Sequence, residues 1–429
     1  MSDGVTIAAA ALLGGVVLGV DIGVALGAAA LLGLALVAPG APFLAAARFA
    51  LGLDSFPLLA IPLFILAGRI MTEGGIARRL VAVLLLALGR LPGALGPVTV
   101  LSTFVLSGVC GSASADTAAI GAVTVPEMRR RGYPMSFAAA VVASAGASGH
   151  LLPPSIDLII VGVVANISVG ALFMAGIVPA FLNLAGILLV SIVIGLLRHL
   201  PKDPDSRVEW RRTLLESLPA LLLPAVIIGG IRGGWFTPTE SAAIAVLAGL
   251  VISMLVYREL GPRQLPALLA DSCRASGAVL FVIGMASSLS FLFTFEQLPH
   301  RLAMFIAAHA GGKISFLLMV NLLFLGVGMV MDALPALIVL MPILVPLAAG
   351  FAISPVQFSI IVLANVGLSF IHPPVGLCLY IGAALAKVDI WAATRQIIPF
   401  FAMLLLTLLL IALFPEITLW LPRHLGLIQ

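Results

Sequence analysis

The chain has 429 residues, of which 62% are hydrophobic and only 9% are charged, and its mean hydropathy is +1.24. Soluble globular proteins are about a quarter charged, so this composition excludes a soluble enzyme, a nucleic-acid-binding protein and a disordered protein. The formal net charge of +4 is expected to come from Lys- and Arg-rich cytoplasmic loops. Long apolar segments that contain many glycines favour an all-α polytopic membrane protein over a β-barrel, whose strands would alternate in polarity.

A helix needs about 20 apolar residues to cross the lipid bilayer, and this length gives five spans in each half of the chain. In chain order the predicted spans are 5–20, 22–38, 56–73, 136–165, 168–197, 214–231, 238–257, 276–295, 354–386 and 390–420. Segments 43–53 and 258–274 are shorter and carry arginines, so we expect them to be amphipathic arms in the interface. The polar stretch 198–213 is the predicted cytoplasmic linker between halves 1–197 and 214–429.

Two further segments, 95–128 and 314–348, each contain two apolar arms of about 13 residues around a Gly-rich centre. Arms of that length are too short to cross the bilayer, so each segment is predicted to be a re-entrant hairpin. We therefore expect two repeats, each with five spans and one hairpin. An odd number of spans places the second repeat inverted relative to the first, as in many secondary transporters.

Matched spacings support the repeat. Asp116 precedes Pro126 by ten residues, and Asp332 precedes Pro342 by the same number. A Pro-Pro pair then follows in each half, at 153–154 and at 373–374. Coincidence rarely matches several spacings in the same order. The excess of Lys and Arg in alternate loops predicts that both termini are periplasmic.

The hairpin tips and the Pro-Pro pairs are four predicted breaks in membrane helices. Broken helix ends expose carbonyl oxygens that suit Na⁺ and amide groups that suit carboxylates. The tips offer Gly111, Ser112, Ser114 and Asp116 in the first half, and Gly326, Gly328 and Asp332 in the second. N-capping of the outgoing hairpin arm is the structural alternative for both aspartates.

The Pro-Pro breaks bring a second set of candidate residues. The prolines themselves are Pro153, Pro154, Pro373 and Pro374, and they are expected to interrupt the spans 136–165 and 354–386. Polar residues beside them are Ser148, His150, Ser155 and Asp157, and Asn365, Ser369 and His372. For each serine the alternative is a small packing residue whose hydroxyl bonds to its own helix.

Several long motifs resemble the large membrane subunit of tripartite ATP-independent periplasmic (TRAP) transporters. They are GGIARRLV (74–81), GSASADTAAIGAVTVPEMRRRGYPMSFAAAVVASA (111–145), LLPPSIDLIIVG (151–162), FTPTESAAIAV (236–246), GMVMDALPALIVLMPILVPL (328–347) and HPPVG (372–376). The resemblance implies an elevator mechanism in the bacterial inner membrane, driven by Na⁺ and with no organic cofactor. It also implies a small carboxylate substrate, such as a C4-dicarboxylate or a sugar acid, a periplasmic substrate-binding protein and a separate small four-helix membrane subunit.

The resemblance also suggests two Na⁺ sites. The first would join Ser107, Gly111 and Ser112 to the break near 148–151, and the second would join Gly326 and Gly328 to the break near 369–372. A stand-alone ion-coupled carboxylate transporter that needs no binding protein is the alternative function. No nucleophile–base pair or HExxH or Walker motif supports an enzyme.

Three residues depart from the family pattern: His150 replaces a common proline, His372 a common threonine and Asp157 an uncharged residue. Each histidine could donate to a substrate carboxylate, with Asp157 holding one of them in place. Each could instead titrate and couple transport to protons. The structural alternative is a hydrogen bond from each imidazole to a backbone carbonyl that is freed at its break.

Overall fold

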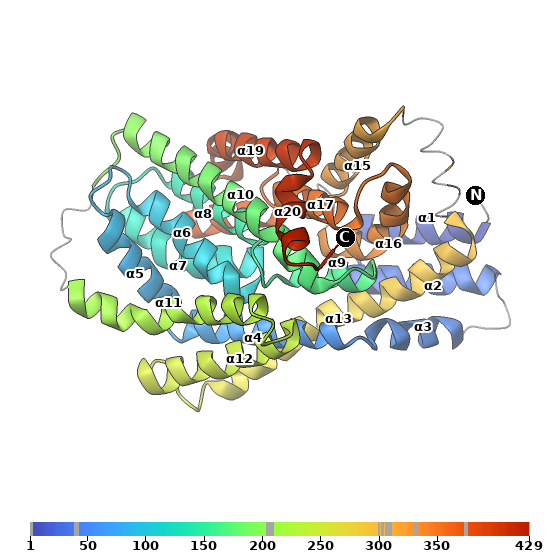
Figure 1. Cartoon of the computed structure of the whole chain (residues 1–429), viewed down its shortest axis with the longest axis horizontal. Coiled ribbons are helices and arrows are strands. Elements are labelled where there is room, and N and C mark those ends of the chain that lie inside the picture. Colours follow the sequence, from blue (N-terminus) through green and yellow to red (C-terminus); the bar gives the residue numbers. More distant parts are fainter. Residues whose placement is uncertain are drawn as a thin grey trace.

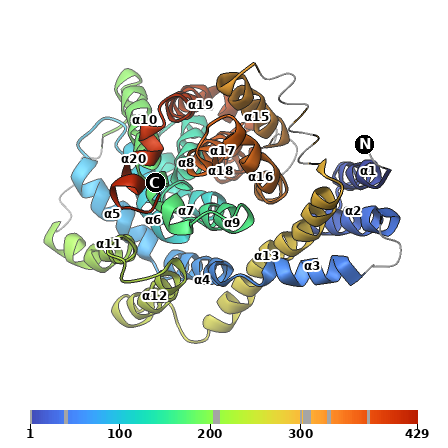
Figure 2. The same cartoon turned by 45° about the vertical axis from the view of Figure 1, so that its right-hand side comes forward.

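The computed structural model describes residues 3–37, 43–202, 210–298, 301, 304, 311–328, 333–372 and 376–428, and every regular element in them is a helix. The helices form two layers, a compact bundle and an outer layer that lies along one side of it (Figures 1 and 2). The outer layer contains α1 (Asp3–Val17), α2 (Ile22–Val37), α3 (Phe43–Leu53), α4 (Ala60–Glu73), α11 (Trp210–Arg232), α12 (Pro238–Leu250) and α13 (Leu265–Phe295).

The bundle draws its helices from both halves of the chain. It contains α6 (Leu95–Cys110), α7 (Ala113–Arg130), α8 (Met135–Gly149), α9 (Ile156–Val164), α10 (Val169–Leu197), α15 (Lys313–Gly328), α16 (Ala333–Gly350), α17 (Pro355–Ser369), α18 (Leu377–Ala386), α19 (Ile390–Leu413) and α20 (Glu416–His424). The helix α5 (Ile76–Leu88) packs against α11 of the outer layer and against α6 and α7 of the bundle. The 3₁₀-helix Phe56–Leu59 precedes α4, and the π-helix Val251–Val256 extends α12.

Six helical segments among the described residues are long and apolar enough to cross a membrane. They are Phe56–Glu73, Val169–Leu197, Trp210–Ile231, Pro238–Val256, Leu265–Phe295 and Ile390–Leu413. Each coincides with a predicted span or contains most of one, so the helical structure and apolar length expected of these six spans are confirmed. The predicted spans 5–20 and 22–38 correspond to α1 and α2, which are shorter helices of 15 and 16 residues.

Helix breaks occur where glycines and prolines predict them. The hairpin 95–128 consists of α6 and α7, which are separated by Gly111 and Ser112. Gly111 adopts a left-handed conformation with φ of +62°, which favours glycine. The helices α8 and α9 are separated by a segment that contains the Pro-Pro pair, and α17 and α18 by the corresponding segment. The centre of the second hairpin, 329–332, lies outside the described residues.

The helices of the bundle recur along the chain in the same order. Starting points Leu95, Ala113, Met135, Ile156 and Val169 in the first half correspond to Lys313, Ala333, Pro355, Leu377 and Ile390 in the second, at an offset of about 220 residues. This regular offset supports two repeats of the same helix order. The inverted orientation of the second repeat stays a prediction.

Three segments differ from the sequence-based expectation. The arm predicted over 258–274 is not a separate helix, because α13 runs from Leu265 to Phe295 without a proline after its first turn. The predicted span 390–420 is two helices, since α19 ends at Leu413 and Phe414 is extended. The helix α5 was not predicted; it follows Gly75, whose φ is +78°, at a sharp turn after α4.

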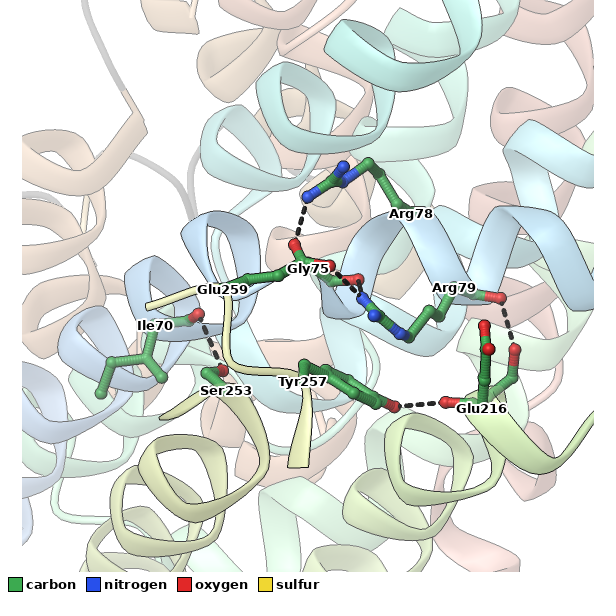
Figure 3. Close-up of polar contacts among 9 residues, drawn as sticks. Ile70, Gly75, Arg78, Arg79, Glu216, Ser253, Tyr257 and Glu259 are labelled. Carbon is green, nitrogen blue, oxygen red and sulfur yellow. Dashed lines mark hydrogen bonds and ion pairs between the residues drawn. The ribbon is translucent and has the colours of Figure 1, made fainter. Parts of the chain in front are cut away.

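A polar cluster fixes this turn against the second half of the chain (Figure 3). Glu259 accepts hydrogen bonds from Arg78 and from Nη1 of Arg79, the latter at 2.6 Å. The Arg79 guanidinium lies 3.6 Å from the centre of the Tyr257 ring. The Tyr257 hydroxyl donates to the carbonyl oxygen of Glu216 at 2.8 Å. The turn between α4 and α5 is therefore held by residues that are distant in sequence.

The helix α8 lies at the centre of the bundle, with every residue from Phe137 to Gly149 buried. It packs against α6, α7, α18 and α19. Its sequence is rich in alanine, glycine and serine, which let neighbouring helices approach closely. A Cβ at Gly382 of α18 would lie 2.6 Å from the carbonyl oxygen of Ala139, so the two backbones are nearly in contact.

We predict that Gly382→Ala lowers the melting temperature of the purified protein in detergent. The added methyl group would overpack the α8–α18 contact and cost about 1–3 kcal/mol. Gly229→Ala on α11 is the matched control, because a Cβ at this position would have no neighbouring atom within 4 Å among the described residues. Equal melting temperatures for the two variants would contradict the close packing of α8 and α18.

Candidate functional site

A cavity of about 680 Å³ lies between the outer layer and the bundle. One wall comes from α4 and α13, and the other from the first hairpin tip, α9, α16 and α18. Four predicted site residues line it: Gly111, Ser112, Ser114 and Asp157. The cavity is therefore the place where the two layers and the first hairpin tip meet.

The hairpin tip rests directly on the break between α8 and α9. The backbone N–H of Ile156 donates to the carbonyl oxygen of Gly111 at 3.3 Å. A Cβ at Gly111 would lie 2.7 Å from the carbonyl oxygen of Pro154, so only glycine fits this contact. Ser112 is the N-cap residue of α7, but its side chain does not cap the helix. The tip and the break are thus adjacent, and a Na⁺ site shared by them stays a prediction.

Asp116 and Ser107 lie behind the tip, and both are fully buried. The Ser107 hydroxyl donates to Oδ2 of Asp116 at 2.6 Å and joins the two arms of the hairpin. Asp116 belongs to the first turn of α7 and is not its N-cap residue, so the capping alternative is wrong in detail. A carboxylate in the first turn still interacts favourably with the helix dipole.

The residues at the end of α8 lie next to the first hairpin. Ser148 donates to the carbonyl oxygen of Ala145 at 2.8 Å, which is the structural alternative expected for a membrane serine. A Cβ at Gly149 would clash with the Ser107 side chain, so the end of α8 touches the hairpin. The Ser155 hydroxyl is buried and has no hydrogen-bond partner among the described residues.

His150 does not reach the cavity. Its Nδ1 lies 2.8 Å from the carbonyl oxygen of Ala147, and its Nε2 lies 2.8 Å from the carbonyl oxygen of Leu363 on α17. The imidazole is fully buried and meets the Phe370 ring edge-on. These contacts agree with the structural alternative for His150 and bridge the two repeats.

A second cluster gathers predicted residues of the second half. A Cβ at Gly328 would clash with Ser369, so the end of α15 touches the end of α17. The Ser369 hydroxyl donates to the carbonyl oxygen of Val366 at 2.7 Å, as Ser148 does to Ala145 in the first repeat. Asn365 donates from Nδ2 to the backbone and side-chain oxygens of Asn321 at 2.9 and 2.7 Å.

The remaining predicted residues do not join this second cluster by any contact that the structure describes. Gly326 is exposed, and a Cβ added there would meet no atom of the described residues within 4 Å. The His372 ring packs edge-on against Phe401, and its Nδ1 has no hydrogen-bond partner in the described part of the chain. Asp332, Pro373 and Pro374 lie outside the described residues.

Comparison with known proteins adds to this geometry. Residues 9–417 match the family model described as the DctM component of the tripartite ATP-independent periplasmic transporter. The chain belongs to this TRAP permease family. Members of the family are transporter permease subunits, so the chain is not an enzyme.

Two relatives and one solved structure illustrate the similarity. The isethionate TRAP transporter permease DctMQ of Oleidesulfovibrio alaskensis is 37% identical over 94% of this chain, which covers 64% of that longer protein. The C4-dicarboxylate TRAP large permease DctM of Pseudomonas aeruginosa is 34% identical over 87% of this chain and 88% of the relative. The YdaH transporter of Alcanivorax borkumensis has a TM-score of 0.60 at 18% identity over 88% of this chain and 89% of its own, which shows a shared fold alone.

Sequence reasoning missed two charged residues of the TRAP permease cavity, Arg69 and Glu73 on α4. Their position within a predicted span was a usable signal, because an ionisable residue in a membrane helix is a functional candidate. A second cavity of about 570 Å³ lies beside the first, between α2, α13 and α16. Its walls are largely apolar, and Val279 and Leu334 line both cavities.

For this TRAP permease we predict that His150→Ala destabilises the fold by about 2–4 kcal/mol, because it removes a fully buried imidazole that hydrogen-bonds to the backbone and leaves a cavity behind. His372→Ala is the control and should lower the melting temperature less. The pH dependence of transport should be the same in His150→Ala and in the wild type. A flattened pH profile with an unchanged melting temperature would instead support proton coupling through His150.

Proposed function

We propose that the chain is the large membrane subunit of a binding-protein-dependent secondary transporter that imports a small carboxylate with Na⁺. The observation that carries this proposal is the cavity between the layers, with the first hairpin tip in its wall. A site at such a junction is exposed or covered when one layer moves past the other. Its position therefore supports an elevator movement of the bundle against the outer layer.

The substrate class is supported by two features. The names of the relatives specify isethionate and C4-dicarboxylate, which are both small organic anions. In this chain the N-terminus of α7 lines the cavity with its N-cap residue Ser112 and with Ala113 and Ser114, and amide groups at a helix N-terminus favour anions. A small carboxylate fits this chemistry, whereas a neutral sugar would gain less from it.

Sodium coupling is supported by oxygen atoms at the two breaks. The hydroxyl of Ser155 and the Oδ1 of Asn365 are buried and have no hydrogen-bond partner among the described residues. A buried acceptor of this kind is costly unless it has a partner. We propose that Na⁺ binds near Gly111 and Ser155 in the first repeat and near Gly328, Asn365 and Ser369 in the second.

The proposed assembly has two protein partners, a periplasmic substrate-binding protein and a small four-helix membrane subunit. We place the complex in the bacterial inner membrane, with both termini of this chain in the periplasm. The apolar outer faces of α11 and α12 support a membrane environment, because large hydrophobic residues such as Leu222 and Leu247 are exposed there.

We predict that Na⁺, compared with choline at equal ionic strength, raises the melting temperature of the purified chain in a saturable way. A ligand that binds only the folded state stabilises it by about 2.7 kcal/mol at a hundredfold excess over Kd. Ser155→Ala should reduce this rise. Ser191→Ala is the matched control, because its hydroxyl is also buried without a partner among the described residues but lies on α10. An identical rise in both variants would exclude Ser155 as a ligand.

We further predict that uptake into proteoliposomes requires the binding protein and an inward Na⁺ gradient. The assay uses the chain together with a small subunit and a binding protein from the same genome, and a panel of radiolabelled succinate, gluconate and isethionate. Replacing the Na⁺ gradient by a proton gradient should abolish uptake. Uptake that continues without the binding protein would instead establish a stand-alone carrier.

A further inference from the structure

The cavity between the layers carries an unequal set of charges. Among the described residues that line it, Arg69 is the one cationic side chain, and Glu73 and Asp157 are the acidic ones. An organic anion entering this cavity therefore meets two repelling carboxylates and one attracting guanidinium. Arg69 projects from α4 of the outer layer, whereas the hairpin tip belongs to the bundle.

The ion pairs of Arg69 are long. Its Nη1 lies 3.7 Å from Oε1 of Glu73, and its Nη2 lies 3.6 Å from Oδ2 of Asp271 on α13. Charge-assisted hydrogen bonds are about 2.7–2.9 Å long, so neither contact is one. Arg274 donates to the other oxygen of the same Asp271 at 2.9 Å.

The exposure of the Arg69 side chain agrees with its lack of a short hydrogen bond. The Arg69 side chain is 40% exposed although it lies on a helix that is apolar enough to cross a membrane. A partly exposed guanidinium that makes no short bond to a described residue keeps its donors available to a ligand in the cavity. The planar fork of arginine matches both oxygens of a carboxylate, and two oxygens of a sulfonate.

We propose that Arg69 is the specificity-determining residue that binds the acidic group of the transported substrate, and that Glu73 and Asp271 hold its guanidinium when the cavity is empty. The inference rests on the proposed function and identifies the residue that selects anions. The substrate would replace two long ion pairs by a bidentate one, with the amides of the first α7 turn available on the opposite wall. Loss of the substrate would return Arg69 to its two carboxylates.

If the substrate displaces Asp271 from Arg69, substitutions of these two residues should change the KM in opposite directions. Arg69→Gln should raise the KM for uptake by about tenfold or more, because a charge-assisted bidentate contact is lost. Arg69→Lys should fall between Arg69→Gln and wild type, since an ammonium keeps the charge but not the fork. Asp271→Asn should lower the KM, because a carboxylate that competes with the substrate is removed.

The control is Arg423→Gln, which removes a short bond to Glu416 on α20 but no residue that lines the cavity or contacts Asp271. It should leave KM unchanged. KM and maximal rate are measured for whichever of succinate, gluconate and isethionate the wild type transports. Melting temperatures of all four variants separate effects on substrate binding from effects on folding.

A purely structural Arg69–Asp271 ion pair would make Arg69→Gln and Asp271→Asn alike, with lower melting temperatures and no fall in KM. That result would overturn the inference and leave the proposed function intact, as would an unchanged KM in Arg69→Gln. If the wild type transported an uncharged sugar and none of the three anions, the proposed function would fail and the inference with it.

Discussion

Backbone amides and carbonyls in a membrane have no water to bond with, and the arrangement of this protein follows from that constraint. The first hairpin tip and the first Pro-Pro pair leave polar backbone groups without helical partners. The fold brings the first tip and the first break together, so that the amide of Ile156 finds the carbonyl of Gly111. The His150 ring lies between Ala147 of the same helix and Leu363 of the other repeat. The irregular segments of the bundle thus supply one another with partners.

The same constraint explains the composition of the central helix. If breaks are to meet inside a bundle, the helices that carry them must approach closely, and α8 consists mainly of residues without large side chains. Glycines at the contacts of α8 with α18, and of the hairpin tip with the break, leave no room for a Cβ. The same residues therefore allow the helices to pack closely and let the backbone groups at the breaks find hydrogen-bond partners. Both effects are concentrated next to the cavity.

Local signals made the positions of the breaks predictable. Pro153 and Pro154 stand together and remove two successive backbone donors from a helix, and the two short arms around Gly111 could not form a crossing helix. Six spans followed in the same way from length and apolarity. The contacts of His150 were not predictable, because Leu363 lies 213 residues away. The position of Arg69 within a predicted span marked it as a candidate, but only tertiary packing shows that it lines a cavity.

The fit of Gly111 against Pro154 and Ile156 has a mechanical consequence. Two segments that share a hydrogen bond and have no space between their backbones cannot separate without leaving buried polar groups unpaired. The first hairpin tip is thus poorly suited to move away from the bundle by itself. Any route to the cavity on this side has to carry the tip and the end of α9 together as one piece. Access is then controlled by the boundary between the layers, where the contacts are side chains that can exchange neighbours.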